Sequence, residues 1–172
     1  MFGVYLGDAD GAQGGEITFG AIDHDHFTGS IGWADVVRKG YWEVALEKAT
    51  LGDIQLAVGS SAAIDTGSSL FAVPSETADK INKIIGGKKS WNGQYMVDCT
   101  TLDSLPLLKL HFGGVEYLLG GHDYVLKVGG GSLFGGAQET CISGFMGLDV
   151  YKSHLDSCTP RPALDCRRRL SA

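Results

Sequence analysis

The sequence predicts an all-β domain that carries one short amphipathic helix. Most apolar residues fall in short runs that are rich in branched or aromatic side chains and end at Gly, Asp or Ser, a pattern typical of β-strands. Glycine is abundant, with 26 of 172 residues, and this excess indicates many tight turns. Residues 75–85 depart from this pattern, because their apolar side chains recur at the spacing of a helix.

The predicted strands follow one another along most of the chain, and turn-forming residues separate them. In order, they cover residues 17–19, 42–46, 54–58, 62–64, 70–73, 95–97, 107–112, 115–119 and 124–128. The glycines of residues 129–136 predict a flexible loop rather than a linker between domains.

The one predicted helix covers residues 75–85. Pro74 precedes it, Glu76 and Asp79 fall near its start, and the glycine pair at 86–87 ends it. Its apolar residues recur at helical spacing and would share one face: Ala78, Ile81, Ile84 and Ile85.

Size and charge exclude several classes of protein. A chain of 172 residues can bury a core of its own, and no apolar run is long enough to span a bilayer. Residues 1–150 carry nine Lys or Arg against eighteen Asp or Glu, so this acidic body does not favour nucleic acid as a partner. The first residues lack the basic start of a signal peptide, so we expect none.

The last 22 residues differ in composition from the rest. Residues 151–172 hold five basic and two acidic side chains, contain an arginine triplet and follow neither strand nor helix periodicity. We expect a disordered basic tail here, and a first domain over residues 1–150. Cys158 and Cys166 lie in this tail and receive no role.

The segment from Ala62 to Leu70 is the strongest candidate for chemistry. An apolar run leads directly into Asp65-Thr66-Gly67-Ser68-Ser69, and a second apolar run follows. This pattern predicts a carboxylate at the tip of a loop between two buried strands, with hydroxyl donors around it and a glycine that lets a ligand approach. Such donors would keep the carboxylate ionised in acid. An ordinary turn would use the same residue types.

This loop and its surroundings resemble the pepsin-like aspartic proteases. The resemblance covers roughly residues 2–150 and is closest to the fungal vacuolar branch of the family. It rests on the Asp65 loop and on motifs that follow in the order of the family's C-terminal lobe: Ile17-Thr18-Phe19-Gly20-Ala21-Ile22-Asp23, Phe27-Thr28-Gly29, Tyr41-Trp42-Glu43-Val44, Lys88-Lys89-Ser90-Trp91-Asn92-Gly93-Gln94-Tyr95, Asp98-Cys99, Phe112-Gly113-Gly114-Val115-Glu116-Tyr117 and Cys141-Ile142-Ser143-Gly144-Phe145.

The resemblance assigns roles to individual residues. Asp65 would be the second of two catalytic aspartates, and Thr66 would form a hydroxyl contact across the junction of the lobes. Gly67 and Ser68 would contact the substrate backbone, and Tyr41 would line the primed side. The family's disulfide would join Cys99 to Cys141, which implies an oxidising route.

The expected activity is that of an aspartic endopeptidase, which cleaves polypeptides at acidic pH without a metal or organic cofactor. The sequence holds a single Asp-Thr-Gly, no flap hairpin and none of the final strands of the family's lobe. A complete dyad would therefore need the N-terminal lobe or a second chain, and only then would pepstatin-like inhibitors bind. The alternative is a catalytically silent lobe that binds peptides or inhibitors or has no function.

No metal site is expected. Asp23-His24-Asp25-His26 has the residue types of a metal cluster, but the resemblance places it in an exposed turn. Intact relatives would reach a vacuole or the extracellular space.

Overall fold

The computed structural model describes residues 1–7, 14–128 and 139–149 and divides the chain into two compact units, residues 1–33 and 34–172. The predicted glycine-rich loop and basic tail lie outside the described residues. Strands dominate the fold and α1 (Ser75–Ile84) is its longest helix, which confirms the all-β prediction with one short helix. Among the described residues, no helix combines the length and apolar character needed to cross a membrane.

The first unit is a β-hairpin followed by a short helical turn. Strands β1 (Phe2–Tyr5) and β2 (Glu16–Phe19) pair antiparallel, with Phe2 opposite Phe19. The 3-10 helix η1 (His24–His26) follows, and the side chain of Asp23 caps it by accepting a hydrogen bond from the Asp25 N–H. Of these two strands only β2 was predicted, over residues 17–19, and β1 was missed.

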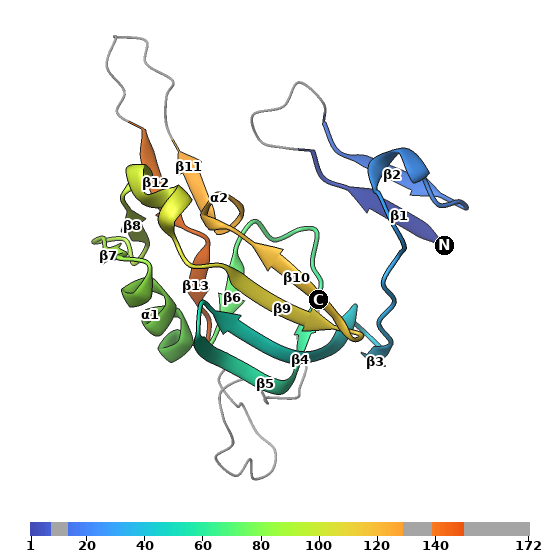
Figure 1. Ribbon diagram of the computed structural model, residues 1–172, viewed down its shortest axis with the longest axis horizontal. Helices are drawn as coiled ribbons and strands as arrows, with labels where there is room; N and C mark the ends of the chain where they lie inside the picture. The colour runs from blue at the N-terminus through green and yellow to red at the C-terminus, as the bar shows by residue number, and fades with distance from the viewer. Residues whose placement is uncertain (8–13, 129–138, 150–172) are drawn as a thin grey trace. The chain divides into compact units, whose positions relative to one another are not determined.

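The larger sheet of the second unit is built on strand β4 (Glu43–Leu51). Strand β5 (Ile54–Ala63) pairs along one edge of β4, while β3 (Val36–Arg38) and β9 (Leu108–Phe112) share the other edge. Strand β10 (Val115–Leu119) extends the sheet beyond β9 (Figure 1). All these pairs are antiparallel, so short turns suffice to connect β4 to β5 and β9 to β10.

Strand β5 corrects the prediction of two separate strands over residues 54–58 and 62–64. The chain stays paired with β4 through Ser60 and Ser61, and the strand ends at Ala63. Gly59 lies between the two predicted segments with a φ of +61°. Because glycine has no Cβ, it adopts this conformation without ending the strand.

Helix α1 confirms the predicted helix to within a residue at its end. Its buried residues Ala78, Ile81 and Asn82 form the inner face. The N-terminus is capped from far along the chain, because Asp149 Oδ1 accepts a hydrogen bond of 2.9 Å from the Ser75 N–H. The N–H of Gly87 closes the other end by donating to the Asn82 carbonyl.

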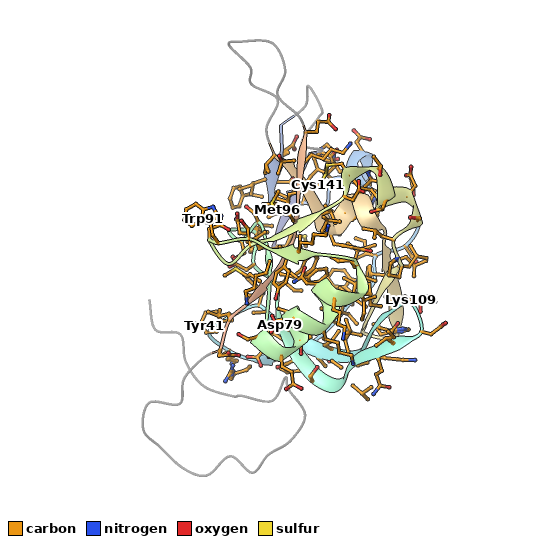
Figure 2. All side chains as sticks on the ribbon, turned by 90° about the vertical axis from the view of Figure 1, so that its left-hand side faces the viewer. Tyr41, Asp79, Trp91, Met96, Lys109 and Cys141 are labelled. Carbon is orange, nitrogen blue, oxygen red and sulfur yellow. A yellow bond between two sulfur atoms is a disulfide. The ribbon has the colours of Figure 1, made fainter. Side chains whose placement is uncertain are left out.

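A second sheet carries the disulfide. Its order is β11 (Val125–Val128), β12 (Thr140–Ser143), β8 (Tyr95–Val97) and β7 (Lys88–Lys89). Trp91 lies in the turn between β7 and β8 and is 97% exposed, so it points away from the protein (Figure 2).

The remaining elements connect the two sheets. Strand β6 (Phe71–Val73) pairs in parallel with β13 (Phe145–Gly147), and the 3-10 helix η2 (Cys99–Ser104) follows β8. Helix α2 (Gly121–Tyr124) precedes β11, so Tyr124 ends a helix instead of beginning the strand predicted for 124–128. Its buried ring belongs to the main core with Leu51, Ile81, Leu108 and Phe145.

Candidate active site

The loop that carries Asp65 connects β5 to β6 and is anchored at its start. Glu43 pairs with Ala63 across the sheet, and the Ile64 N–H donates to the Trp42 carbonyl at 2.9 Å. Asp65 therefore follows directly after the last backbone hydrogen bond of a long strand. The pairing of β5 with β4 therefore fixes the position at which the Asp65 loop begins.

Both carboxylate oxygens of Asp65 accept hydrogen bonds from the same loop. Oδ1 accepts from the Gly67 N–H and Oδ2 from the Ser68 hydroxyl, each at 2.9 Å. A longer contact of 3.4 Å joins the Ser68 N–H to the Asp65 carbonyl. The loop thus folds around its own carboxylate, and Ser68 is one of the hydroxyl donors that the sequence predicts there.

These contacts lower the pKa of Asp65. The Gly67 N–H contributes most, followed by the Ser68 hydroxyl, because both stabilise the ionised carboxylate. Burial opposes them only weakly, since the side chain is exposed. The carboxylate consequently stays an anion in more acidic solution than an ordinary aspartate would.

The loop is less enclosed than predicted. The sequence places it between two buried strands, yet Ile64 is 51% exposed and Leu70 is half-buried. The last residues of β5 and all of β6 are likewise only partly covered among the described residues. Ile64, directly before the carboxylate, is therefore open to solvent, whereas Leu70 after the loop is partly covered.

The structure gives a steric reason for glycine at position 67. Its backbone does not adopt a left-handed conformation, but a Cβ at this position would lie 3.2 Å from Asp65 Oδ1. The absent side chain leaves room for the carboxylate to accept the Gly67 N–H bond. Thr66 forms the exposed turn between them.

Tyr41 lies in the turn that joins β3 to β4 and is 38% exposed, at the surface (Figure 2). Its neighbour Trp42 is the residue whose carbonyl accepts the Ile64 N–H. The structure therefore brings the turn of Tyr41 to the base of the Asp65 loop.

Glu43 is a residue near this site to which the sequence assigned no role. It is 7% exposed, and its carboxylate accepts from Arg38 Nε and from the Ser61 hydroxyl, both at 2.6 Å. Through these two contacts Glu43 of β4 links Arg38 of β3 to Ser61 of β5, close to the end of β5 that leads to Asp65. The only sequence signal for this residue was an acidic side chain directly after the aromatic pair Tyr41-Trp42. The sequence could not show its burial, because that depends on the flanking strands β3 and β5.

A parallel strand supports the other side of the loop. The Phe71 N–H donates to the Gly144 carbonyl at 2.7 Å, and the Phe71 and Phe145 rings stack with centroids 5.1 Å apart. The Leu148 N–H donates to the Val73 carbonyl and continues the contact. Residues after Asp65 are thus held by residues 144–148.

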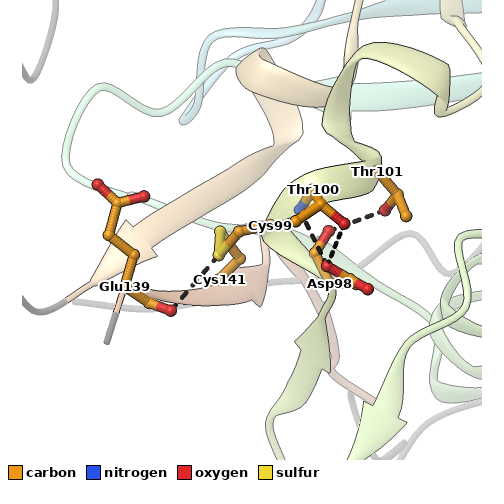
Figure 3. Close-up of a disulfide and its surroundings, with 6 residues drawn as sticks. All are labelled: Asp98, Cys99, Thr100, Thr101, Glu139 and Cys141. Atoms are coloured by element: carbon orange, nitrogen blue, oxygen red, sulfur yellow. Dashed lines mark hydrogen bonds between the residues drawn. A yellow bond between two sulfur atoms is a disulfide. The ribbon is translucent and has the colours of Figure 1, made fainter. Parts of the chain in front are cut away.

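The disulfide joins Cys99 to Cys141, which confirms the pairing that the family resemblance implies. Cys141 is buried in the core, while Cys99 begins helix η2, whose cap is the Asp98 carboxylate bound to the Thr100 N–H (Figure 3). The bond fastens β12 to the start of η2 and so stabilises the sheet that packs against α1.

Comparison with known proteins identifies the family. Residues 1–157 match the family described as eukaryotic aspartyl protease. A vacuolar aspartic protease of Candida albicans is 46% identical over 152 residues, which cover 87% of this chain and 34% of the relative. A probable vacuolar protease A of Arthroderma benhamiae is 44% identical over 152 residues, with coverage of 87% and 36%. Cathepsin E of Mus musculus is 39% identical over 153 residues, with coverage of 87% and 37%.

This chain belongs to the eukaryotic aspartyl protease family. It spans about a third of the length of the curated relatives it matches. The resemblance that the Asp65 loop suggested is therefore confirmed at the level of the family.

Proposed function

We propose that this chain supplies one half of the active site of an aspartic endopeptidase, with Asp65 as its catalytic carboxylate. The observation that carries the proposal is the exposed Asp65 carboxylate, whose two oxygens accept the Gly67 N–H and the Ser68 hydroxyl. These bonds orient the carboxylate and lower its pKa, as a base that works in acid requires.

The proposed reaction uses two carboxylates that share one proton. Two acids held close together cannot both ionise, so one stays protonated while the other is an anion. The anion takes a proton from a water molecule as that water attacks the peptide carbonyl, and the protonated acid donates to the carbonyl oxygen. Asp65 fits the role of the anion because its loop stabilises the ionised form.

The second acid would come from an N-terminal lobe or another chain, because the sequence contains a single Asp-Thr-Gly. We assign this chain to the C-terminal lobe, with Thr66 at the junction of the lobes and Tyr41, Gly67 and Ser68 on the substrate. Coverage of about a third of each relative supports a single lobe. The substrate would be a polypeptide, and pepstatin-like inhibitors would bind once the dyad is complete.

The proposed compartment is the vacuole. Several relatives are named vacuolar proteases, and the Cys99–Cys141 disulfide is compatible with passage through an oxidising compartment. An acidic compartment would also suit a carboxylate with a lowered pKa.

The test is a cleavage assay at acidic pH with the full chain, alone and mixed with the N-terminal lobe of the Candida albicans relative. We expect pepstatin-sensitive cleavage only in the mixture, and its loss in Asp65→Asn. The matched control is Asp53→Asn, which changes another exposed aspartate, in the turn between β4 and β5. Cleavage by Asp65→Asn at the wild-type rate contradicts the proposal. A mixture that binds pepstatin without cleaving supports the silent alternative.

A further inference from the structure

Three potential metal ligands meet in the first unit, where no role has been assigned. His26 Nε2 lies 3.5 Å from Glu16 Oε2 and 3.7 Å from Asp23 Oδ2. One ligand atom from each residue can be chosen so that all three lie within 4.8 Å of one another. Glu16 belongs to β2, whereas Asp23 is the N-cap of η1 and His26 is its last residue. Two separate segments of the chain therefore build this cluster.

We propose that the Glu16–Asp23–His26 cluster binds a divalent transition metal, with Zn²⁺ as the best fit. A tetrahedral zinc site with bonds of 2.0–2.2 Å places its ligand atoms about 3.3–3.6 Å apart. The two distances from His26 Nε2 are close to that range. One imidazole nitrogen with two carboxylate oxygens is a ligand set that zinc accepts, and water would complete the coordination.

The other histidine ion pairs of the described residues are shorter. His111 contacts Glu116 at 3.0 Å, and His122 contacts Asp103 at 2.9 Å. Each of these histidines forms an ion pair with a single carboxylate at an ordinary hydrogen-bond distance. His26 Nε2 instead contacts two carboxylates, through a hydrogen bond of 3.5 Å to Glu16 and an ion pair of 3.7 Å to Asp23. Three ligand atoms therefore converge here, whereas each of the other two histidines contacts one carboxylate.

Groups outside the cluster orient each ligand. The Thr18 hydroxyl donates to Glu16 Oε1 at 3.2 Å, and the Asp25 N–H donates to Asp23 Oδ1 at 2.9 Å. In both carboxylates the other oxygen is the one that faces His26. The His26 ring stacks on Tyr5, with centroids 4.1 Å apart and planes 10° apart. Metal ligands are commonly oriented by such outer contacts.

The family resemblance favoured an exposed turn for the Asp-His-Asp-His run. The structure selects the first and last residues of that run and adds Glu16 from β2. The bound ion would hold the η1 turn against the hairpin and stabilise the first unit. This inference is independent of the proposed peptidase activity.

The test is a calorimetric titration of the full chain with Zn²⁺, together with ¹⁵N NMR spectra. We expect shifts that centre on Glu16, Asp23 and His26, and binding about tenfold weaker or more in His26→Asn and in Glu16→Gln. Thr18→Val keeps all three ligands, so weaker binding in this variant would identify the orienting role of the hydroxyl.

The matched control is His24→Asn, which removes a neighbouring histidine outside the cluster. The His24→Asn variant should bind Zn²⁺ with the affinity of the wild type. Zn²⁺ should raise the thermal unfolding midpoint of the wild type and of His24→Asn, but not that of His26→Asn. The proposal is wrong if the folded chain binds no Zn²⁺ at millimolar concentration. It is also wrong if His26→Asn and His24→Asn bind equally well, or if the shifts centre on His111 or His122.

Discussion

The Ser68 hydroxyl lies 2.9 Å from Oδ2 of Asp65, and the Gly67 N–H occupies the other oxygen of the same carboxylate. The ionised form of Asp65 is thereby stabilised by the loop that presents it. This stabilisation is present above the carboxylate's pKa in the unfolded chain, and it is lost as pH falls through the lower pKa of the folded state.

Replacing Ser68 by Ala should raise the pKa of Asp65 toward the ordinary aspartate value, because one donor to the anion is removed. A ¹³C NMR titration of the Asp65 carboxyl carbon measures this change. Ser69→Ala is the control and should leave the titration unchanged. An equal rise in both variants would mean that the Ser68 hydroxyl is not the donor.

Removing the guanidinium of Arg38 should destabilise the second unit, because it removes the ion pair that Arg38 forms with the buried Glu43 carboxylate. The side chain of Arg38 is 38% exposed, so we expect a loss of about 1–3 kcal/mol in Arg38→Met, below the cost for a fully buried pair. Urea unfolding measures the loss. Lys39→Met is the control at the adjacent turn, and its stability should match the wild type. An Arg38→Met variant as stable as Lys39→Met would show that the pair is not needed.

Removing the disulfide should lower the free energy of unfolding by about 4 kcal/mol in the chain-entropy treatment, since the two cysteines are 42 residues apart. The comparison is urea unfolding of the Cys99→Ser, Cys141→Ser double variant against the wild type. Cys158→Ser serves as the control, since the sequence assigns that cysteine no role. If the control loses as much stability as the double variant, the contribution assigned to this bond is wrong.

Tyr124 should make the folded state sensitive to alkali. Burial raises its pKa to about 12, and its hydroxyl donates to the Pro106 carbonyl at 2.7 Å. The contribution of the protonated Tyr124 side chain to the free energy of unfolding is fully present below the ordinary tyrosine pKa of about 10. It is lost as pH rises toward about 12. Stability measured by urea unfolding across this interval should fall more steeply in the wild type than in Tyr124→Phe. Identical slopes in the two proteins would contradict the assignment.

The predictable parts of the fold are those that local sequence controls. Helix α1 was predicted almost to the residue because its apolar spacing and the glycine pair after it act within the same short segment. Strands β9 and β10 were predicted for the same reason, since their runs are apolar and separated by glycines.

The parts that escaped prediction depend on partners that are distant in the sequence. Strand β7 consists of Lys88 and Lys89 and is a strand only because β8 pairs with it. Strand β13 requires β6, and the cap of α1 comes from Asp149. None of these relationships leaves a periodic pattern in the residues themselves.

The candidate sites also contain parts that local sequence predicts and parts that depend on distant segments. Asp65, Gly67 and Ser68 lie within four consecutive residues, so the motif made them candidates, and the structure shows the hydrogen bonds between them. The anchoring of Ile64 to Trp42, the burial of Glu43 and the approach of Glu16 to His26 each join segments that only the folded chain brings together.

The parallel pairing of Phe71 with Phe145 has a consequence for the order of events during biosynthesis. A ribosome must translate all of residues 74–144 before the segment just after Asp65 can meet its partner strand. Contacts between such distant segments form slowly, because a long loop has to close first. The Asp65 loop should therefore be among the last parts of a nascent chain to become ordered, well after the hairpin of β4 and β5 has formed.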